Sequence, residues 1–414
     1  MEQRKSPRDP KVIFLKLIHM RISVITQYYK PEMGAPQNRL FEMCVGLKNL
    51  GTEISVITAM PNYPTGSIFP EYKGKCSYRE NLDGIEILRY WLYASNSRKA
   101  LPRIWSMISY SVTVLGSLRY LAKRKNDFII VESPPLTLAV SALLLARLTG
   151  AKLIMNVSDL WPLSAKELGA ISGDGLTYKI LARLEHFLYK HSAACIGQSQ
   201  EIVDYIATHG AKATYLFRNG VAPERFDGIE HHQRGDKLCV VYTGLLGYAQ
   251  GILGICEHVD FAKLNAEFHI YGAGGEQDAI EAYLAAHPDK GIFYHGKVAR
   301  EEIPSVLSKH DCTLIPLVKN IFGAVPSKIY ESMAAGLPII FSGEGEGARI
   351  IQENKLGWVS SALDYDGLST NIREASTNTK VYTECASNCV TCAKNKFNRP
   401  KQIKGLYTYL SQLL

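Results

Sequence analysis

A lysine and a glutamate three residues apart, at the start of a predicted helix, have the types and spacing needed to bind a nucleotide. Pro326 can preset the first helical turn, which places Ser327 and Lys328 at the helix N-terminus. Backbone N–H groups, the helix dipole and an ammonium then converge where a diphosphate could bind. Glu331 shares a helix face with Lys328, and its carboxylate could accept from both hydroxyls of a ribose. A surface ion pair on a capped helix would have the same spacing.

Glycine-containing turns follow several predicted strands, where backbone N–H groups can approach an anion. Three such turns contain Gly34 and Ala35, Gly244 and Gln250, and Gly272 and Gly274. The last two turns follow successive strands, so together they could cradle a nucleotide diphosphate, although ordinary turns would explain them equally well. The chain has no GxGxxG fingerprint, which argues against a dinucleotide site and against a dehydrogenase.

Short apolar runs alternate with helix-length segments along most of the chain, a pattern typical of parallel sheets built from βαβ units. In the first half the runs are Ile22–Thr26, Ile54–Thr58, Ile85–Tyr90, Phe128–Val131, Lys152–Val157 and Ala193–Ile196. In the second half they are Leu238–Tyr242, Glu267–Tyr271, Ile292–Tyr294, Cys312–Pro316, Pro338–Phe341 and Trp358–Val359. Helices are expected over Asn38–Leu50, Leu136–Leu148 and Leu176–Tyr189.

The length of 414 residues favours two domains, and a polar passage divides the alternation. We expect an α/β fold of two Rossmann-like doubly wound domains facing across a cleft, where the carboxyl ends of the strands bind ligands. The first domain spans 20–222, a hinge spans 223–237 and the second domain spans 238–395. Residues 396–414 are predicted to form a helix that packs on the first domain. Residues 1–19 are expected to be an extension without a signal peptide, which an upstream start would explain.

Three groups of residues have the spacing of a metal site, but each is better explained without a metal ion. The adjacent histidines 231 and 232 lie in the polar hinge, and Asp364 of a DxD sequence is expected to cap a helix. Cys385, Cys389 and Cys392 have a CxxxCxxC spacing but lie in a predicted helix. Most of the nine cysteines occur in apolar stretches, which indicates reduced thiols in a cytoplasmic protein. We therefore expect no metal cofactor.

The net charge of +8 is concentrated in a region that has no acidic residue between Ile87 and Asn126. Between Arg103 and Arg119 this region contains an uncharged run with Trp105, which is too short to span a membrane. The predicted partner is an anionic inner-leaflet membrane surface, rather than nucleic acid, contacted through Arg98, Lys99, Arg103 and Trp105. A buried helix with solvated basic ends is the equal alternative.

At this point the chain resembles retaining glycosyltransferases of family 4, which have the GT-B fold. Besides the segment around Glu331, the ordered matches are Asn62–Gly66, Asp159–Pro162, Arg218–Val221, Gly244–Gly251, Gly272–Gly274 and His295–Val298. The set is most similar to the L-fucosamine-type transferases of bacterial surface-polysaccharide clusters. The resemblance implies transfer of a sugar, such as an N-acetylated amino or deoxyamino sugar, from a UDP-sugar to a polyprenyl-diphosphate-linked acceptor at the inner membrane.

The resemblance also implies roles for individual residues. Glu331 would bind the ribose, Lys328 and Ser327 the diphosphate, and the main chain at Lys297 and Val298 the base. The resemblance implies further roles for residues of the first domain. Gly34 and Ala35 would close over the diphosphate, Asp159 would face the transferred sugar, and Asn62 would lie on the acceptor side.

Two positions depart from the family pattern. The glutamate that usually contacts the donor sugar is replaced by Gly323, so the amides of residues 322–324 (Phe322, Gly323 and Ala324) are expected to make that contact. An arginine and a lysine in the loop after the first strand of the second domain are replaced by Leu245 and Gln250. Two alternatives stay open: a GT-B sugar-nucleotide 2-epimerase, and a non-catalytic sugar-nucleotide-binding protein.

Overall fold

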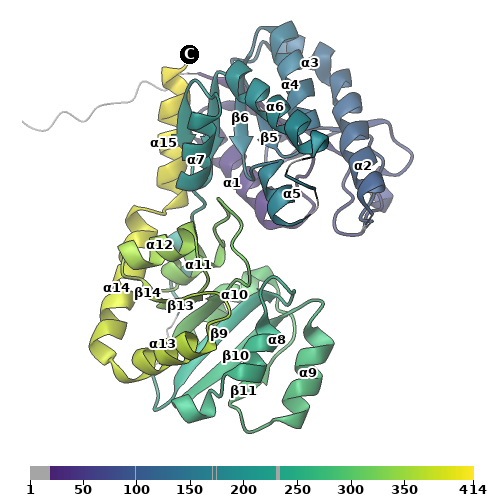
Figure 1. Ribbon diagram of the computed structural model, residues 1–414. Helices are drawn as coiled ribbons and strands as arrows, with labels where there is room; N and C mark the ends of the chain where they lie inside the picture. Colours follow the sequence, from purple (N-terminus) through teal and green to yellow (C-terminus); the bar gives the residue numbers. More distant parts are fainter. Residues whose placement is uncertain (1–18, 98, 170, 174, 230–233) are drawn as a thin grey trace, which may run out of the picture.

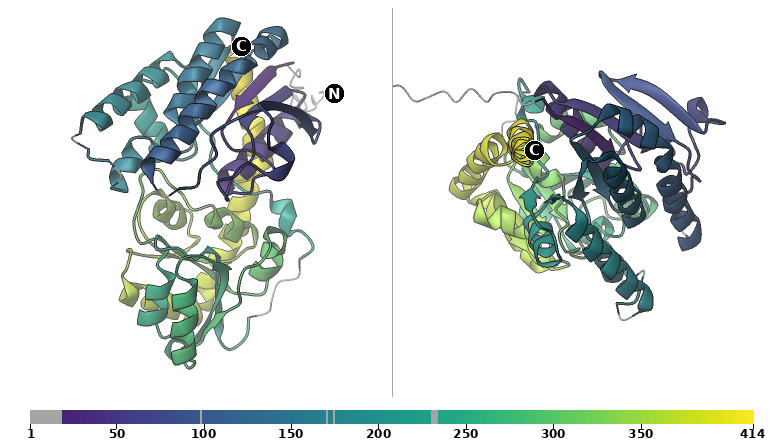
Figure 2. Two further views of the ribbon diagram at one scale, coloured as in Figure 1. Left: turned by 90° about the vertical axis from the view of Figure 1, so that its right-hand side faces the viewer. Right: turned by 90° about the horizontal axis from the view of Figure 1, so that it is seen from above.

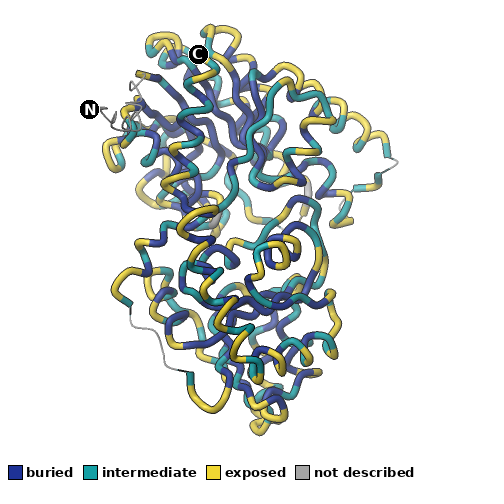
Figure 3. The backbone as a smooth tube through the Cα atoms, turned by 90° about the vertical axis from the view of Figure 1, so that its left-hand side faces the viewer, coloured by how far each residue is buried: buried dark blue, intermediate teal, exposed yellow. Residues whose placement is uncertain are grey.

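The computed structural model describes residues 19–97, 99–169, 171–173, 175–229 and 234–414. Two α/β domains lie one above the other, each with a sheet between layers of helices (Figure 1). In both, the central strands are buried, whereas the outer helices and loops are more exposed (Figure 3). Because helices cover both faces of each sheet, the central strands appear in the sequence as continuous apolar runs.

The first domain contains an eight-stranded sheet in the order β3-β4-β2-β1-β5-β6-β7-β8. Every neighbouring pair is parallel except β3 with β4. The strands are β1 (Arg21–Ile25), β2 (Glu53–Ala59), β3 (Ser77–Leu82), β4 (Ile85–Tyr90), β5 (Phe128–Ser133), β6 (Lys152–Val157), β7 (Ala194–Gly197) and β8 (Thr214–Leu216). The helices are α1 (Ala35–Asn49), α2 (Ala100–Thr113), α3 (Leu118–Arg124), α4 (Leu136–Thr149), α5 (Leu163–Glu167), α6 (Leu176–His191) and α7 (Gln200–Thr208).

The second domain contains a six-stranded parallel sheet in the order β11-β10-β9-β12-β13-β14. Its strands are β9 (Leu238–Leu245), β10 (Ala266–Ala273), β11 (Ile292–Tyr294), β12 (Cys312–Pro316), β13 (Ile339–Ser342) and β14 (Gly357–Ser360). Its helices are α8 (Ile252–His258), α9 (Gln277–Ala286), α10 (Ile303–Leu307), α11 (Lys328–Ala334), α12 (Glu346–Glu353), α13 (Tyr365–Thr377) and α14 (Thr379–Asn395).

The C-terminal segment returns to the first domain. Val221 and Asn398 form an isolated parallel bridge where the two domains meet. Helix α15 (Arg399–Gln412) then runs beside the first domain, as Figures 1 and 2 show. Ile403 and Leu406 are buried with residues of α1 in one core cluster, and Gly46 of α1 leaves the space that the Ile403 side chain fills. Burial of these apolar groups holds the end of the chain against the first domain.

The predicted strands correspond to strands of the structure, in four cases with identical ends: β4, β6, β11 and β12. Two strands were missed. β3 has the sequence SYRENL and is mostly exposed at the sheet edge, so it lacks the apolar run on which the prediction depends. β8 is only three residues long and half-buried.

Candidate functional site

A cavity of about 620 Å³ lies between the two domains. The loop after β1 contributes Gly34, and the end of β9 contributes Gly244. The start of α11 and the segment after β11 lie on the same side as Gly244, in the second domain. The lining includes the predicted residues Gly34, Gly244, Lys297, Val298, Ser327, Lys328 and Glu331. Residues separated by almost 300 positions in the chain therefore meet at one cavity.

Lys328 is the first residue of α11, and it is half-buried. Its ammonium lies 3.0 Å from the Tyr242 hydroxyl and 4.3 Å from the centre of that ring. Burial lowers the pKa of Lys328 to about 8, and the more distant Glu331 opposes this shift. Gly244 makes the arrangement possible, because a Cβ at that position would lie 2.5 Å from the Lys328 Cε. An ammonium without a carboxylate in direct contact is suited to bind an anion.

Glu331 lies one helical turn further along the same face. Its carboxylate is 3.7 Å from the guanidinium of Arg225, and burial raises its pKa while Arg225, Arg300 and Lys328 lower it. With a quarter of its side chain exposed, the carboxylate remains accessible from the cavity. A ribose diol could therefore bind to it by charge-assisted hydrogen bonds.

Basic residues outnumber acidic ones around this cavity. Glu42 is shared between Arg399 at 3.3 Å and Arg300 at 3.7 Å, and it is the main counter-charge contributed by α1. The basic side chains that line the cavity are Arg39, Arg225, Lys297, Arg300, Lys328 and Arg399, against Glu42, Glu301 and Glu331. This excess of positive charge suits a diphosphate. The sequence reading missed Arg225, Arg300 and Arg399, because the first was assigned to the hinge and the last to a packing helix.

Two domain families match the chain on either side of the cleft. Residues 34–220 match the family described as Glycosyl transferase 4-like domain, and residues 237–378 match Glycosyl transferases group 1. The chain is a GT-B glycosyltransferase.

Relatives with assigned names agree with this identification. The chain is 26% identical over 274 residues to "Probable glycosyltransferase WbjE" of Pseudomonas aeruginosa, covering 63% of this chain and 67% of the relative. It is 25% identical over 344 residues to "Putative colanic acid biosynthesis glycosyl transferase WcaI" of Escherichia coli K12, covering 78% and 84%. Among solved structures, HepE from Anabaena in complex with UDP superposes with a TM-score of 0.69 at 14% identity, covering 95% of this chain and all of that one.

Gly272, near the end of β10, and Gly274, just after it, are not among the residues that line the interdomain cavity. A Cβ on Gly272 would lie 1.9 Å from the Gly244 carbonyl oxygen, and one on Gly274 would lie 2.3 Å from the Leu246 carbonyl oxygen. They therefore allow two backbones to approach and shape the loop that carries Gly244. Gln250 lines a smaller neighbouring cavity, which it shares with Ser327 and Lys328.

The loop at residues 322–324 also differs from the expectation. The Phe322 amide donates to the Glu167 carboxylate at 3.1 Å, and the Gly323 amide donates to Glu201 at 2.7 Å. The Ala324 amide donates to the Ile321 carbonyl at 3.0 Å. In this conformation each of the three amides donates to an acceptor within the protein. None of them is free to donate to the sugar in the way that we had expected.

Gly323 is explained by this docking. Its φ of +82° is a conformation that favours glycine, and a Cβ there would lie 2.6 Å from the Ile202 Cγ1. Any larger residue, including the usual glutamate, would push the loop away from α7. The carboxylate that α7 offers, Glu201, is held in turn by Arg349 at 2.6 Å. The loop is thus anchored to the first domain.

Asp159 lines neither the interdomain cavity nor its neighbour in the first domain. It accepts a hydrogen bond from the Ser164 hydroxyl at 3.0 Å. Burial raises the pKa of Asp159, while hydrogen bonds from Ser164 and from the Leu160 backbone lower it. The structure therefore shows a local contact at the start of α5, and a role toward the sugar stays a prediction.

A second cavity of about 350 Å³ lies in the first domain and shares Gly34 with the larger one. Asn62 and Arg103, two of the residues predicted on the acceptor side, line this cavity together. Their contact with an acceptor stays a prediction. Buried Glu32 accepts from the amides of Asn62 and Tyr63 at 2.8 Å, and this fixes the loop. Burial raises the pKa of Glu32 to about 7 despite these hydrogen bonds.

The other predicted acceptor or membrane residues lie outside this cavity. Lys99 and Trp105 are exposed, with 61% of Trp105 accessible. Arg98, like His231 and His232, lies outside the described residues. Ala35 begins α1 next to the cavity. Lys99, just before α2, and Trp105 on α2 therefore face solvent.

The sequences that imitate metal sites have structural roles. Asp364 caps α13 by accepting from the Gly367 amide at 2.9 Å, as predicted. Cys385, Cys389 and Cys392 lie buried on α14, and the Cys389 thiol donates to the Leu337 carbonyl at 3.4 Å. They are helix thiols packed against the second domain.

Proposed function

We propose that this glycosyltransferase transfers a sugar from a UDP-sugar to a lipid-linked saccharide in bacterial surface-polysaccharide synthesis, with retention of anomeric configuration. The observation that carries the donor assignment is the Lys328–Glu331 pair in an otherwise basic cavity between the domains. HepE, a structural neighbour, is described in complex with UDP, and the relative WcaI is named for colanic acid biosynthesis.

In this proposal the nucleotide binds to the second domain. Glu331 accepts from the ribose hydroxyls, and the backbone near Val298 contacts the base. The ammonium of Lys328 contacts the diphosphate, where negative charge increases as the glycosidic bond to the leaving group breaks. Stabilising that charge in an enclosed site is the main contribution to catalysis that the geometry supports.

Retention follows a front-face path that needs no protein nucleophile. The acceptor hydroxyl attacks the anomeric carbon on the face from which UDP leaves, through an oxocarbenium-like state. The hydroxyl proton passes to the departing diphosphate, so charge and atoms balance without a metal ion. The protein supplies positioning of donor and acceptor.

The donor proposal is tested with purified full-length protein and a panel of UDP- and GDP-sugars. Thermal shift identifies the nucleotide, because a bound ligand stabilises the folded state by mass action. We expect a shift with UDP and with one UDP-sugar, and its loss in Glu331→Ala. Glu301→Ala, which removes another carboxylate of the same cavity, serves as control. A shift that persists in Glu331→Ala would contradict the assignment.

The reaction type is tested by product analysis with and without a lipid-linked acceptor. Transfer should appear only with acceptor, and the product should keep the donor's anomeric configuration in NMR spectra. Formation of an epimerised sugar nucleotide without acceptor would identify a 2-epimerase instead, and the absence of both transfer and donor hydrolysis would favour a binding protein.

The acceptor side of the proposal uses the outer face of the first domain. Helices α2, α4 and α6 are neighbours there. They expose several large apolar side chains. They are Leu101, Ile104, Trp105, Val112, Val140, Leu144, Leu148, Leu176, Ile180 and Phe187. The only acidic residue in these three helices is Glu185, which is buried, whereas Arg103, Arg147, Lys179, Arg183 and Lys190 are basic. An apolar and basic face suits an anionic bilayer.

No helix among the described residues is long and apolar enough to span a bilayer. Binding at the surface is therefore the form of membrane association that we propose, on the cytoplasmic side. Flotation with vesicles containing anionic lipid should recover the wild-type protein and lose Trp105→Glu/Leu144→Glu. The control Leu363→Glu changes a similarly exposed residue of the second domain. Equal flotation of all three proteins would contradict this surface.

A further inference from the structure

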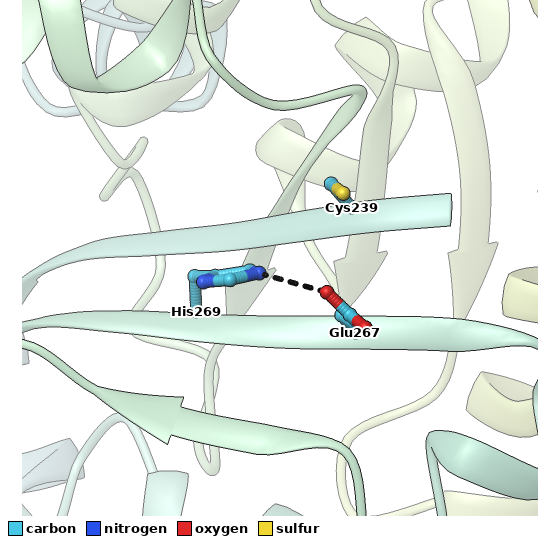
Figure 4. Close-up of side chains that lie close together, drawn as sticks. All are labelled: Cys239, Glu267 and His269. Atoms are coloured by element: carbon cyan, nitrogen blue, oxygen red, sulfur yellow. Dashed lines mark ion pairs between the residues drawn. The ribbon is translucent and has the colours of Figure 1, made fainter. Parts of the chain in front are cut away.

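Three side chains of different chemistry meet on the sheet of the second domain (Figure 4). Cys239 lies on β9, and Glu267 and His269 lie on β10. In the parallel register Glu267 pairs with Cys239. Residues two apart on a strand point to the same face, so His269 lies on the face that carries Glu267. One ligand atom from each side chain lies within 4.8 Å of the other two.

The second polar atom of each ligand on β10 is already engaged. The Nε2 of His269 faces the Glu267 Oε2 at 3.7 Å, whereas its Nδ1 lies 3.0 Å from the His295 Nε2. The other oxygen of Glu267 accepts from the exposed Lys237 ammonium at 2.9 Å. Metal-binding histidines and carboxylates in proteins are usually oriented by outer hydrogen bonds of this kind.

One tautomer of His269 that the His295 contact allows leaves metal-donor atoms turned toward one another. If His269 Nδ1 carries the hydrogen, its Nε2 presents a lone pair toward a carboxylate oxygen and a sulfur. Neutral imidazole is the form that coordinates a metal.

We propose that Cys239, Glu267 and His269 bind a divalent cation of the zinc class. Thiolate, imidazole and carboxylate are together the ligands that Zn²⁺ takes in a tetrahedral site. Glu267 binds through Oε2 while Oε1 stays with Lys237, and water completes the fourth position. Ligands of such an ion lie roughly 3.5 Å apart, so the side chains need to close by about 1 Å.

Binding is a simple exchange of a proton for the ion. The Cys239 thiol releases its proton to solvent when the sulfur–metal bond forms, because the thiolate is the form that coordinates a metal. No redox step is involved.

The site lies apart from the donor cavity but is connected to it. His295, which contacts His269, is separated by one residue from Lys297, and Lys297 and Val298 line the cavity. A bound ion would tie β9 and β10 together and fix His295. We expect it to stabilise the second domain and the segment after β11, with the chemistry of transfer left to other residues.

The test uses metal-free, tag-free full-length protein titrated with Co²⁺ and, separately, with Zn²⁺. Wild-type protein should bind one equivalent of Co²⁺ and show a thiolate-to-cobalt charge-transfer band in the near ultraviolet. Zn²⁺ should displace the Co²⁺ and raise the Tm by about 2 °C or more. Cys76→Ser removes an exposed cysteine and His287→Gln a histidine elsewhere in the same domain, so both should behave as wild type.

Cys239→Ser should abolish the charge-transfer band, and His269→Gln or Glu267→Gln should weaken Co²⁺ binding by about 10-fold or more. His269→Gln and Glu267→Gln keep the size of the native side chain, so they test the site even if Cys239→Ser folds poorly. No band in wild type, or a band that survives in Cys239→Ser, would overturn the proposal. UDP binding measured in the same samples is independent of either outcome.

Discussion

The two sides of the interdomain cleft hold their positive charge in different ways. On the first domain, Arg39 projects from α1 onto the buried Glu132 of β5 at 2.5 Å, so its charge is already neutralised. On the second domain, Lys328 has the Tyr242 hydroxyl as its close partner, and its pKa falls to about 8. A paired buried cation holds the fold together, whereas a desolvated cation beside a cavity is available to a ligand. Arg39 on the first domain therefore stabilises the fold, whereas Lys328 on the second domain is available to bind a ligand.

The largest effect should come from breaking the pair on the first domain. Arg39→Met leaves Glu132 buried without its cation, and Asn156 remains as a polar partner. We expect the free energy of unfolding to fall by about 3–5 kcal/mol. Urea denaturation followed by circular dichroism measures this. The double variant Arg39→Met/Glu132→Gln should recover a large part of the loss, and a double variant as unstable as the single one would argue against the pair.

The matching change on the second domain should affect activity instead of stability. Lys328→Met removes a desolvated charge that could neutralise a leaving diphosphate, so transfer should fall about 100- to 1000-fold. Urea denaturation should show a free energy of unfolding equal to or above that of wild type, because a buried charge is gone. Initial rates with the preferred donor measure the first effect. A variant that is strongly destabilised but retains its turnover would reverse the comparison.

Much of this arrangement could be predicted from the sequence, because it depends on neighbouring residues. Lys328 and Glu331 lie on one short helix, and the apolar runs that became β6 and β12 are buried on both faces of their sheets. The absence of a dinucleotide fingerprint and the two α/β domains also follow from local patterns, whereas the GT-B fold was implied by the resemblance to family 4 glycosyltransferases. The cap at Asp364 was also predicted correctly for this reason.

The parts that failed depend on contacts between distant segments. Arg399 reaches the cavity only because α15 crosses back to the first domain, and Arg225 only because the hinge folds beside α11. Gly272 and Gly274 were read as a phosphate-binding turn, and the close approach of their Cα atoms to the backbone at Gly244 and Leu246 was not foreseen. Their contact with the donor stays a prediction. Gly323 is required by Ile202 of the other domain, a neighbour that no sequence period reveals.

Gly323→Ala tests whether the contact between the two sides matters for turnover. The added Cβ would meet Ile202, and a φ of +82° is strained for alanine, at a cost of about 1–3 kcal/mol. The loop should lose its hydrogen bonds to Glu167 and Glu201, and kcat should fall about 10-fold with little change in the Kd for UDP. Gly235→Ala, in open space, is the matched control. Unchanged kcat in Gly323→Ala would separate loop docking from catalysis.

The smallest expected effect is the pH dependence of nucleotide binding. A bound diphosphate favours the protonated form of Lys328 and so raises its pKa above the free value of about 8. Below pH 8 the free side chain is already protonated, and this group leaves the affinity for UDP unchanged. Above pH 8 the protonated fraction falls, so Kd should rise by up to about tenfold per pH unit. Calorimetric titration with UDP from about pH 7 to 9 measures the slope.

Lys328→Arg isolates this charge from other titrating groups, because arginine stays protonated throughout that range. Its Kd for UDP should be flat where the wild-type value rises, even if the larger guanidinium weakens binding at every pH beside Gly244. A wild-type Kd that is equally flat from pH 8 to 9 would mean that the free ammonium is less desolvated than its position against Tyr242 implies. The distinction between a paired cation on one side and an available cation on the other would then lose its electrostatic basis.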